Sequence, residues 1–169
     1  MDIGAGIGAG TMVAAKTGCT VMAIEPTPYM RQGLGARRFI TRTQDQVQIV
    51  DGTAEATTVA DGSIDAAWAV NTMHHWSSLE DGIAEIVRTL APGGRVLLVD
   101  ESFDDPDHPD HEQFSAKFAE REHHFHTVDP DVAASVFTAA GMTVNFAGHD
   151  QIAGRPSIIV EASKPKPAV

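Results

Sequence analysis

Glycine recurs at every second position near the start of the chain, where residues 2–8 read DIGAGIG. Glycine has no Cβ atom, so a loop built this way lets the backbone approach a ligand closely. A helix that follows such a loop offers unpaired N–H groups to the same ligand. Gly4, Gly6 and Ala9 also satisfy the dinucleotide pattern G-x-G-x-x-A. This spacing predicts a loop that wraps a nucleotide-type cofactor.

A carboxylate that could hold a ribose stands at Glu25, directly after the apolar residues 20–24 (TVMAI). The end of a parallel strand faces the same crevice as the glycine loop, and a carboxylate there can accept hydrogen bonds from both ribose hydroxyls. Acidic residues are common on protein surfaces, so Glu25 alone does not indicate a ribose site. It becomes informative because the glycine loop lies upstream. The two features together indicate a cofactor that contains a ribose.

A pair of histidines, His74 and His75, follows the apolar residues 64–70 (IDAAWAV). Ligands in open α/β sheets lie at this end of the strands, and imidazole is a suitable general base near neutral pH. Both histidines are therefore candidate catalytic residues, although they could also serve only to shape the loop. Asp100 and Glu101 end the next apolar run at the same rim and are alternative bases.

Five further histidines raise the question of a metal site. They are His108, His111, His123, His124 and His126. His123 and His126 have the i, i+3 spacing that a helix needs to present two ligands on one face. Surface histidines are common, however, and spacing alone does not make a metal site. We therefore expect no metal here.

Short apolar runs alternate with helical patterns along the first hundred residues. The runs predict buried strands at 20–24, 46–50, 64–70 and 95–100. Helices are expected at 11–17 and 28–38, and a third after the capping signals of residues 77–81. This third helix carries apolar residues at i, i+3, i+4 and i+7 from Ile83 and is expected to end at residues 92–94 (PGG). The alternation predicts βαβ units and a parallel sheet covered on both faces.

The last third of the sequence has a different pattern. Residues 104–110 form an acidic, proline-containing loop, and residues 112–122 are expected to be helical. Asp129 and Pro130 predict the start of a helix that ends near residue 140. Strands at 143–147 and 157–162 then form an antiparallel hairpin. We expect one domain over residues 1–163 and a flexible tail at 164–169.

Composition excludes several classes of function. The net charge of -11 repels phosphate backbones, so nucleic acid is not an expected partner. No apolar run reaches the length of a membrane span, and mean hydropathy is -0.10. Cys19 is the only cysteine, which excludes a disulfide framework or a cysteine-based zinc site within one chain. These properties favour a cytoplasmic protein without a membrane partner.

Four later motifs separate the nucleotide-binding families from one another. In chain order they are residues 52–55 (GTAE), 61–65 (DGSID), 73–75 (MHH) and 90–94 (LAPGG). In this order and spacing the sequence resembles the class I S-adenosylmethionine-dependent methyltransferases, and among them the small-molecule enzymes of ubiquinone and menaquinone biosynthesis. The resemblance covers residues 1–100 by motif and 129–163 by general pattern. It implies a Rossmann-like, doubly wound, mostly parallel sheet with a C-terminal antiparallel hairpin, and it assigns residues 101–128 to a variable substrate lid.

The resemblance also implies roles for individual residues toward S-adenosylmethionine. Its methionine part would be wrapped by three glycines and approached by one aspartate, namely Gly4, Gly6, Gly8 and Asp2. The ribose hydroxyls would be held by Glu25, and Met30 would pack beside the adenosine. The adenine edge would meet Thr53 and Ala54, the latter through its backbone N–H. Residues 69–71, ending in Asn71, would form the floor under the methyl donor.

One position departs from the family pattern. The loop after the third strand usually reads Gly-Asp-Ala-Glu, whereas Thr53 replaces the aspartate here. The Thr53 hydroxyl can still form a hydrogen bond but brings no charge. Losing a charge-assisted contact to the adenine amine would weaken binding by about 1 kcal/mol.

The expected activity is methyl transfer to a small-molecule oxygen, nitrogen or carbon acceptor by in-line displacement. The residues after the fourth strand read Asn71-Thr72-Met73-His74. They lack the Asn/Asp-Pro-Pro-Tyr motif of methyltransferases that act on amino groups of DNA or of protein glutamine. A non-catalytic or crippled protein of the same fold that binds a ligand or partner is the main alternative, supported by Thr53 and by the short start of the chain. An NAD-dependent oxidoreductase is the third, and it rests only on the glycine loop and Glu25.

The start of the chain carries a separate expectation. In the family, apolar strand residues precede the aspartate of the glycine motif, and only residues 1–3 could form that strand here. We therefore expect the first, central strand to be largely missing, as in a chain truncated at its N-terminus. An upstream extension would then raise stability and cofactor affinity. Exposed strand edges would also favour self-association as a homodimer.

Overall fold

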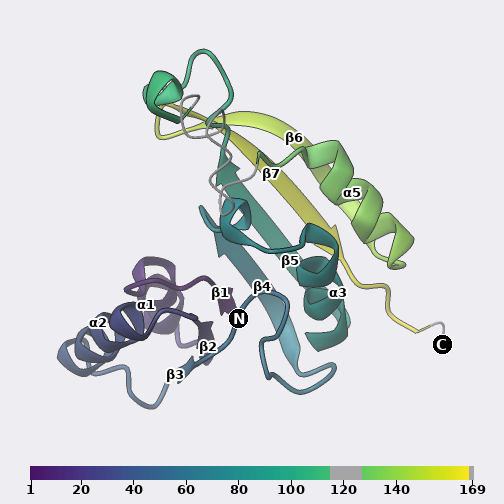
Figure 1. Cartoon of the computed structure of the whole chain (residues 1–169). Helices are drawn as coiled ribbons and strands as arrows, with labels where there is room; N and C mark the ends of the chain where they lie inside the picture. The colour runs from purple at the N-terminus through teal and green to yellow at the C-terminus, as the bar shows by residue number, and fades with distance from the viewer. Residues whose placement is uncertain (115–126, 168–169) are drawn as a thin grey trace.

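The computed structural model describes residues 1–114 and 127–167. Its seven-stranded sheet has the order β3-β2-β1-β4-β5-β7-β6 (Figure 1). Strands β1 to β5 run parallel to one another, while β7 runs antiparallel to both β5 and β6. The predicted doubly wound, Rossmann-like sheet with a C-terminal antiparallel hairpin is therefore confirmed.

The elements follow the predicted alternation closely. The strands are β1 (Asp2–Ile3), β2 (Val21–Ile24), β3 (Val47–Val50), β4 (Ile64–Val70), β5 (Leu90–Glu101), β6 (Thr143–Ile152) and β7 (Arg155–Ser163). The helices are α1 (Ala9–Lys16), α2 (Pro28–Ile40), α3 (Leu79–Thr89) and α5 (Pro130–Ala139), with a 3-10 turn η1 at Met73–His75. The predicted helix at 112–122 lies mostly outside the described residues, as does much of the predicted lid at 101–128.

Two helices begin where side chains satisfy free backbone N–H groups. At α3 the Ser78 hydroxyl accepts a hydrogen bond from the Asp81 N–H at 3.1 Å. At α5 the Asp129 carboxylate accepts from Asp131 N at 2.8 Å, and Pro130 takes the first helical position. These are the caps that the sequence predicts, and each satisfies a donor that the helix itself cannot pair.

Each face of the sheet has its own apolar core. Along β2, Val21 and Ala23 pack against α1 and α2, whereas Ile24 points to the opposite face, which α3 and α5 cover. This alternation follows from the two-residue period of a strand. Figure 1 shows α1 and α2 beside β1–β3, with α3 and α5 at the other end of the sheet. The helices on the two faces hold the strands so that the carboxyl ends of β1 to β5 share one edge.

The helix before β5 ends earlier than predicted. We expected residues 92–94 to end it, but α3 ends at Thr89 and Leu90 already pairs with Ile64 of β4. At Gly94 a Cβ atom would lie 2.9 Å from the Ala91 carbonyl and 3.0 Å from that of Ile64, so only glycine permits this close approach. Pairing with β4 thus makes residues from Leu90 onward part of strand β5. Local propensity does not reveal this pairing.

The C-terminal hairpin is also longer than predicted. Pairing of β6 with β7 runs from Thr143 opposite Ser163 to Ile152 opposite Arg155. Beyond it, the Lys164 ammonium donates hydrogen bonds to the carbonyls of Val87 and Leu90 at 2.7 and 2.8 Å. Lys164 opens the predicted flexible tail, yet these bonds hold its side chain against the end of α3 and the start of β5.

Strand β1 comprises two residues, consistent with the short first strand that the sequence predicts. Asp2 lies opposite Ala23 of β2 and Trp68 of β4. Met1 is buried, and its α-ammonium donates to the Ala66 carbonyl at 2.6 Å. Burial lowers the pKa of this ammonium to about 6. The expected effect of an upstream extension stays a prediction.

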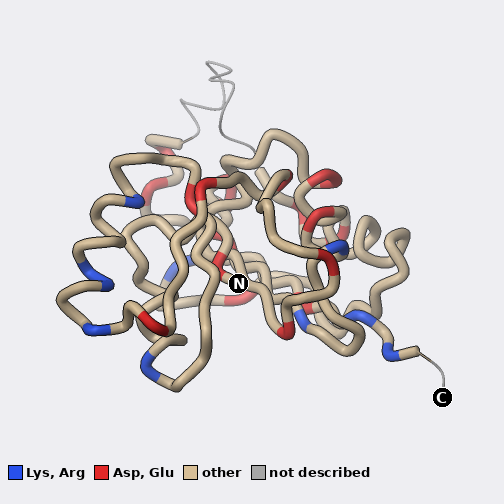
Figure 2. Tube along the Cα trace, turned by 90° about the horizontal axis from the view of Figure 1, so that it is seen from below, with Lys and Arg blue, Asp and Glu red and all other residues tan. Residues whose placement is uncertain are grey.

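The charge of the chain and the length of its helices bear on two predicted exclusions, a nucleic-acid partner and a membrane span. Figure 2 shows acidic residues along much of the trace, and Lys and Arg are fewer, at 12 against 23 acidic residues in the whole sequence. Among the described helices, none combines the length and the apolar character that crossing a membrane would require.

Candidate functional site

Loops that follow four neighbouring strands converge on one small cavity of about 100 Å³. The carboxyl ends of parallel strands meet at one edge of a sheet, which is why segments far apart in sequence come together there. The cavity is lined by Ile3, Gly4, Pro26, Gly52, Thr53, Ala54, Glu55, Thr72, His75, Trp76 and Ser77. Four of the predicted site residues, Gly4, Thr53, Ala54 and His75, are thus brought to one place.

The glycine loop has a backbone that other residues adopt only with strain. Gly4 has φ +67°, and a Cβ atom there would lie 2.2 Å from the Thr72 hydroxyl oxygen. Gly8 has φ +85°, and its Cβ atom would lie 2.2 Å from a methyl carbon of Leu34. Both positions combine a left-handed backbone with a close neighbour, so both require glycine. Gly8 is also the residue from which α1 starts.

Glu25 lies against the glycine loop, as its position after β2 predicts. One carboxylate oxygen accepts a hydrogen bond from Gly6 N at 2.8 Å, and the other accepts from Thr27 N at 2.9 Å. The side chain is buried, and these two bonds fix its orientation. A carboxylate offers about four lone-pair sites, so two remain for hydroxyl groups of a ligand.

Other predicted cofactor residues lie outside the lining of this cavity. The Asp2 carboxylate is buried and accepts from the Thr11 hydroxyl on α1 at 2.5 Å. Burial raises the pKa of Asp2, and the bond from Thr11 partly opposes that rise. Met30 is half-buried in the first turn of α2. Asn71 is exposed with φ +52°, and its side-chain amide donates to Glu101 at 3.0 Å.

The loop that carries Thr53 and Ala54 is tightly turned. Thr53 N donates to the Ala56 carbonyl at 3.2 Å, and Ala56 N donates back to the Thr53 carbonyl at 3.3 Å. A Cβ atom on Gly52 would lie 2.8 Å from the Ala56 oxygen, so glycine is needed for the turn to close. Ala54 is buried at the cavity wall, while Thr53 is exposed.

The two candidate catalytic histidines occupy different environments. His75 is exposed and lines the cavity, whereas His74 is buried. His74 Nδ1 lies 2.7 Å from one Asp100 oxygen, and His74 N donates to the other oxygen at 3.1 Å. An ionised carboxylate can only accept, so this contact places an imidazole proton on Nδ1 and orients the ring.

A second polar cluster surrounds Glu101 at the end of β5. His108 Nε2 lies 2.9 Å from one Glu101 oxygen, and Arg155 donates to the same oxygen at 2.8 Å. Burial acts to raise the pKa of Glu101, but the hydrogen bonds from Arg155 and His108 outweigh it and hold the pKa below its usual range. Sequence reasoning missed this cluster because Arg155 lies 54 residues from Glu101 and no local pattern joins them.

Aromatic rings pack beside His74 on the same rim. The Phe103 ring meets the His74 ring edge-on with centroids 5.3 Å apart, and Phe114 lies 4.2 Å from Phe103. His74 and His75 have ring centroids 4.1 Å apart. These contacts make the surroundings of His74 partly apolar, which suits an organic acceptor.

The histidines of the expected lid form no metal centre within the described part of the chain. In residues 1–114 and 127–167, no group of three or more His, Cys, Asp or Glu side chains is placed to hold a metal ion. His108 contacts Glu101, and His111 Nδ1 lies 3.3 Å from the Phe103 carbonyl. The remaining candidates, His123, His124 and His126, lie outside the described residues.

Comparisons with known proteins agree with this geometry. Residues 1–98 match the model of a family described as a methyltransferase domain. An uncharacterized methyltransferase of Mycobacterium tuberculosis is 35% identical over 99 residues, which cover 59% of this chain and 38% of the relative. A demethylmenaquinone methyltransferase of Tropheryma whipplei is 32% identical over 103 residues, covering 60% of this chain and 41% of the relative. The chain thus spans less than half the length of these curated relatives.

The fold extends the likeness beyond the matched motifs. A geranyl diphosphate C-methyltransferase from Streptomyces coelicolor, solved with S-adenosyl-L-homocysteine, superposes with a TM-score of 0.78 at 15% identity. The superposition covers 96% of this chain and 71% of that one. At this identity the likeness concerns the fold, including the C-terminal hairpin that the family match leaves out.

Proposed function

The chain belongs to this family of methyltransferase domains, and on that premise we propose that it transfers the methyl group of S-adenosylmethionine to a small-molecule acceptor. The observation that carries the proposal is the meeting of Glu25 with the glycine loop beside the cavity formed by the loops after β1 to β4. A ribose-directed carboxylate and a close-approach backbone are the two parts that such a cofactor needs.

The residues around the cavity fit the cofactor in the chemistry of their donors and acceptors. Gly4 and Gly6 would lie along its methionine part. Asp2, which accepts a hydrogen bond from Thr11, would approach the same part of the cofactor. Glu25 would accept from the ribose hydroxyls, and Ala54 would meet the adenine edge. The cavity of about 100 Å³ equals roughly three water molecules, so in this conformation it takes only part of a nucleoside. Met30 and Asn71 would complete the site from outside that volume.

When bound, S-adenosylmethionine supplies a methyl group already activated on a sulfonium, so positioning of the acceptor accounts for much of the rate. His74 would remove the acceptor proton through Nε2, and Asp100 would orient the ring and stabilise the imidazolium that results. His75, which lines the cavity, would contact the ligands. Phe103 and Phe114 would exclude water near the reacting atoms.

The acceptor is proposed to be a small, largely apolar molecule. One relative is named for demethylmenaquinone and a structural neighbour for geranyl diphosphate, both organic molecules with apolar portions. The net charge of -11 disfavours nucleic acid. A cytoplasmic location is part of the proposal, supported by Cys19 as the sole cysteine. A homodimer is also part of it, supported by exposed Val70 and Leu97 on one face of the sheet.

Calorimetric titration with S-adenosylhomocysteine tests the cofactor, and methyl transfer from labelled S-adenosylmethionine to a panel of quinols and isoprenoids tests the reaction. We expect saturable binding followed by labelled product for at least one acceptor class. Binding without transfer to any acceptor would favour the non-catalytic alternative. Absence of binding would overturn the proposal, and saturation by NADH would favour an oxidoreductase.

A further inference from the structure

Helix α3 holds the loop after β3 from two sides. On one side, Glu55 accepts hydrogen bonds from Ser77 N at 2.6 Å and Ser78 N at 3.3 Å, at the start of the helix. On the other, Glu85 in the second turn of α3 accepts from Thr57 N at 2.8 Å and from the Thr57 hydroxyl at 2.6 Å. Ala54, which forms part of the cavity wall, directly precedes Glu55 and lies three residues before Thr57.

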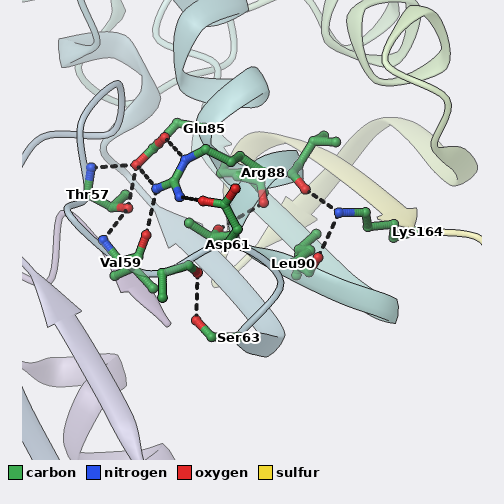
Figure 3. Close-up of polar contacts among 12 residues, drawn as sticks. Thr57, Val59, Asp61, Ser63, Glu85, Arg88, Leu90 and Lys164 are labelled. Atoms are coloured by element: carbon green, nitrogen blue, oxygen red, sulfur yellow. Dashed lines mark hydrogen bonds and ion pairs between the residues drawn. The ribbon is translucent and has the colours of Figure 1, made fainter.

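The Glu85 anchor is rigid because its carboxylate is itself held. Arg88 donates from Nε to one Glu85 oxygen at 2.7 Å and from Nη2 to the other at 2.8 Å (Figure 3). Arg88 also donates to the Val59 carbonyl at 2.7 Å and contacts Asp61. The Glu85 side chain is only 12% exposed and Thr57 is fully buried, so water competes little for these bonds.

The backbone beside the anchor stores strain. Thr58 has φ +59°, a left-handed conformation that a β-branched residue rarely adopts. Such a conformation persists only where neighbouring contacts impose it, and the adjacent contacts are the two bonds from Thr57 to Glu85 and the bond from Val59 N to the Thr57 hydroxyl. Without them the residues after Ala54 would relax toward a more favourable backbone, and the turn from Gly52 to Ala56 would lose its support.

We infer that Glu85 is a positioning residue for the nucleobase of the cofactor, acting through Thr57 to hold the backbone N–H of Ala54 at the adenine edge. The inference rests on the proposed function, since it concerns the same cofactor. Glu85 touches no ligand itself, because its carboxylate is occupied by Thr57 and Arg88 and it is not part of the cavity lining. Its effect is on how well the site recognises adenine.

A pair of ligands isolates that effect. S-adenosylhomocysteine presents adenine, whose N1 accepts a hydrogen bond, whereas S-inosylhomocysteine presents hypoxanthine, whose N1 is a donor. A backbone N–H held at this position distinguishes the two by about tenfold, the factor expected for one hydrogen bond. Both ligands bind only folded protein, so the ratio of their dissociation constants is independent of any change in stability.

The experiment measures this ratio by calorimetry for the wild-type chain and three variants. We expect Glu85→Ala to reduce the preference for adenine from about tenfold to about twofold. Glu85→Gln keeps an acceptor oxygen for Thr57 and should retain most of the preference. Asp61→Asn alters the exposed end of the Arg88 contact and should leave the ratio unchanged.

The outcomes separate the inference from the proposed function. If the wild-type chain binds neither ligand, the proposed function fails. If it binds S-adenosylhomocysteine but Glu85→Ala weakens both ligands equally, Glu85 is merely structural and the inference is wrong. A wild-type chain that binds the two ligands equally also overturns the inference, because there is then no adenine contact to position.

Discussion

His74 Nδ1 lies 2.7 Å from Asp100 Oδ1, joining the turn after β4 to the end of β5. The Asp100 side chain is 1% exposed, and it also accepts from the backbone N–H groups of His74 and Glu101. A buried carboxylate with these contacts holds one imidazole tautomer and one ring orientation. His75, the next residue, lies at the cavity instead.

The contact between His74 and Asp100 predicts that His74, rather than His75, acts as the general base. We expect His74→Ala to reduce the rate of methyl transfer by about 10²–10⁴-fold, the usual contribution of a general base, with little change in cofactor affinity. Asp100→Asn should lower the rate in the same direction by disturbing the tautomer. Single-turnover rates and S-adenosylhomocysteine titrations measure the two effects separately. A His75→Ala variant that lost more rate than His74→Ala would contradict the assignment.

Gly4 predicts a steric effect at the cofactor loop. We expect Gly4→Ala to abolish measurable binding of S-adenosylhomocysteine, because its Cβ atom would meet the Thr72 hydroxyl at 2.2 Å. Gly18→Ala is a matched control, since Gly18 has φ +90° but nothing within 4 Å of the added atom. The control should cost about 1 kcal/mol of stability through backbone strain and leave binding intact. Equal binding by both variants would show that the loop does not approach the ligand.

Glu25 predicts a dependence on the ribose. Replacing it in Glu25→Gln leaves one acceptor oxygen and puts a donor amide against either Gly6 N or Thr27 N. We expect affinity for S-adenosylhomocysteine to fall by at least about tenfold, as for a lost charge-assisted bond. The same variant should lose less affinity for a 2′,3′-dideoxy analogue, which has no hydroxyls to hold. Glu80→Gln, on the exposed start of α3, serves as the control.

Glu85 predicts an acid-dependent loss of stability. Its hydrogen bonds, chiefly from Arg88, lower its pKa from 4.5 to about 2. A carboxyl whose pKa is depressed by folding stabilises the native state above its unfolded pKa, and this contribution is lost as pH falls from about 5 toward 2. With about 1.4 kcal/mol for each pKa unit, we expect Glu85 to contribute about 1–3 kcal/mol at neutral pH.

Urea unfolding at several pH values measures that contribution. The unfolding free energy of the wild-type chain should drop more steeply between pH 5 and pH 3 than that of Glu85→Gln, which cannot titrate. Parallel pH profiles for the two proteins would mean that Glu85 has an ordinary pKa in the folded chain.

Much of the fold follows from local signals. Alternating apolar runs and helical patterns predicted β2, β3, β4 and the start of α5 nearly to the residue, because strand burial and helix capping are encoded by near neighbours. The early start of β5 at Leu90 could not be predicted, because it depends on pairing with Ile64 and on the close approach at Gly94. The full length of the hairpin likewise depends on pairing between β6 and β7 rather than on propensity.

By itself the sequence predicted the type of site: a glycine loop, a carboxylate expected to face a ribose and a histidine pair, each at the end of a strand that topology brings to one edge. The tertiary structure alone decided which groups meet across that edge. It directed His74 rather than His75 toward Asp100, 26 residues away, and Glu85 toward Thr57, 28 residues away. The physical reason is that spacing along a chain specifies which strand or helix a side chain belongs to. Which side chains of different elements contact one another is decided by how the helices and strands pack.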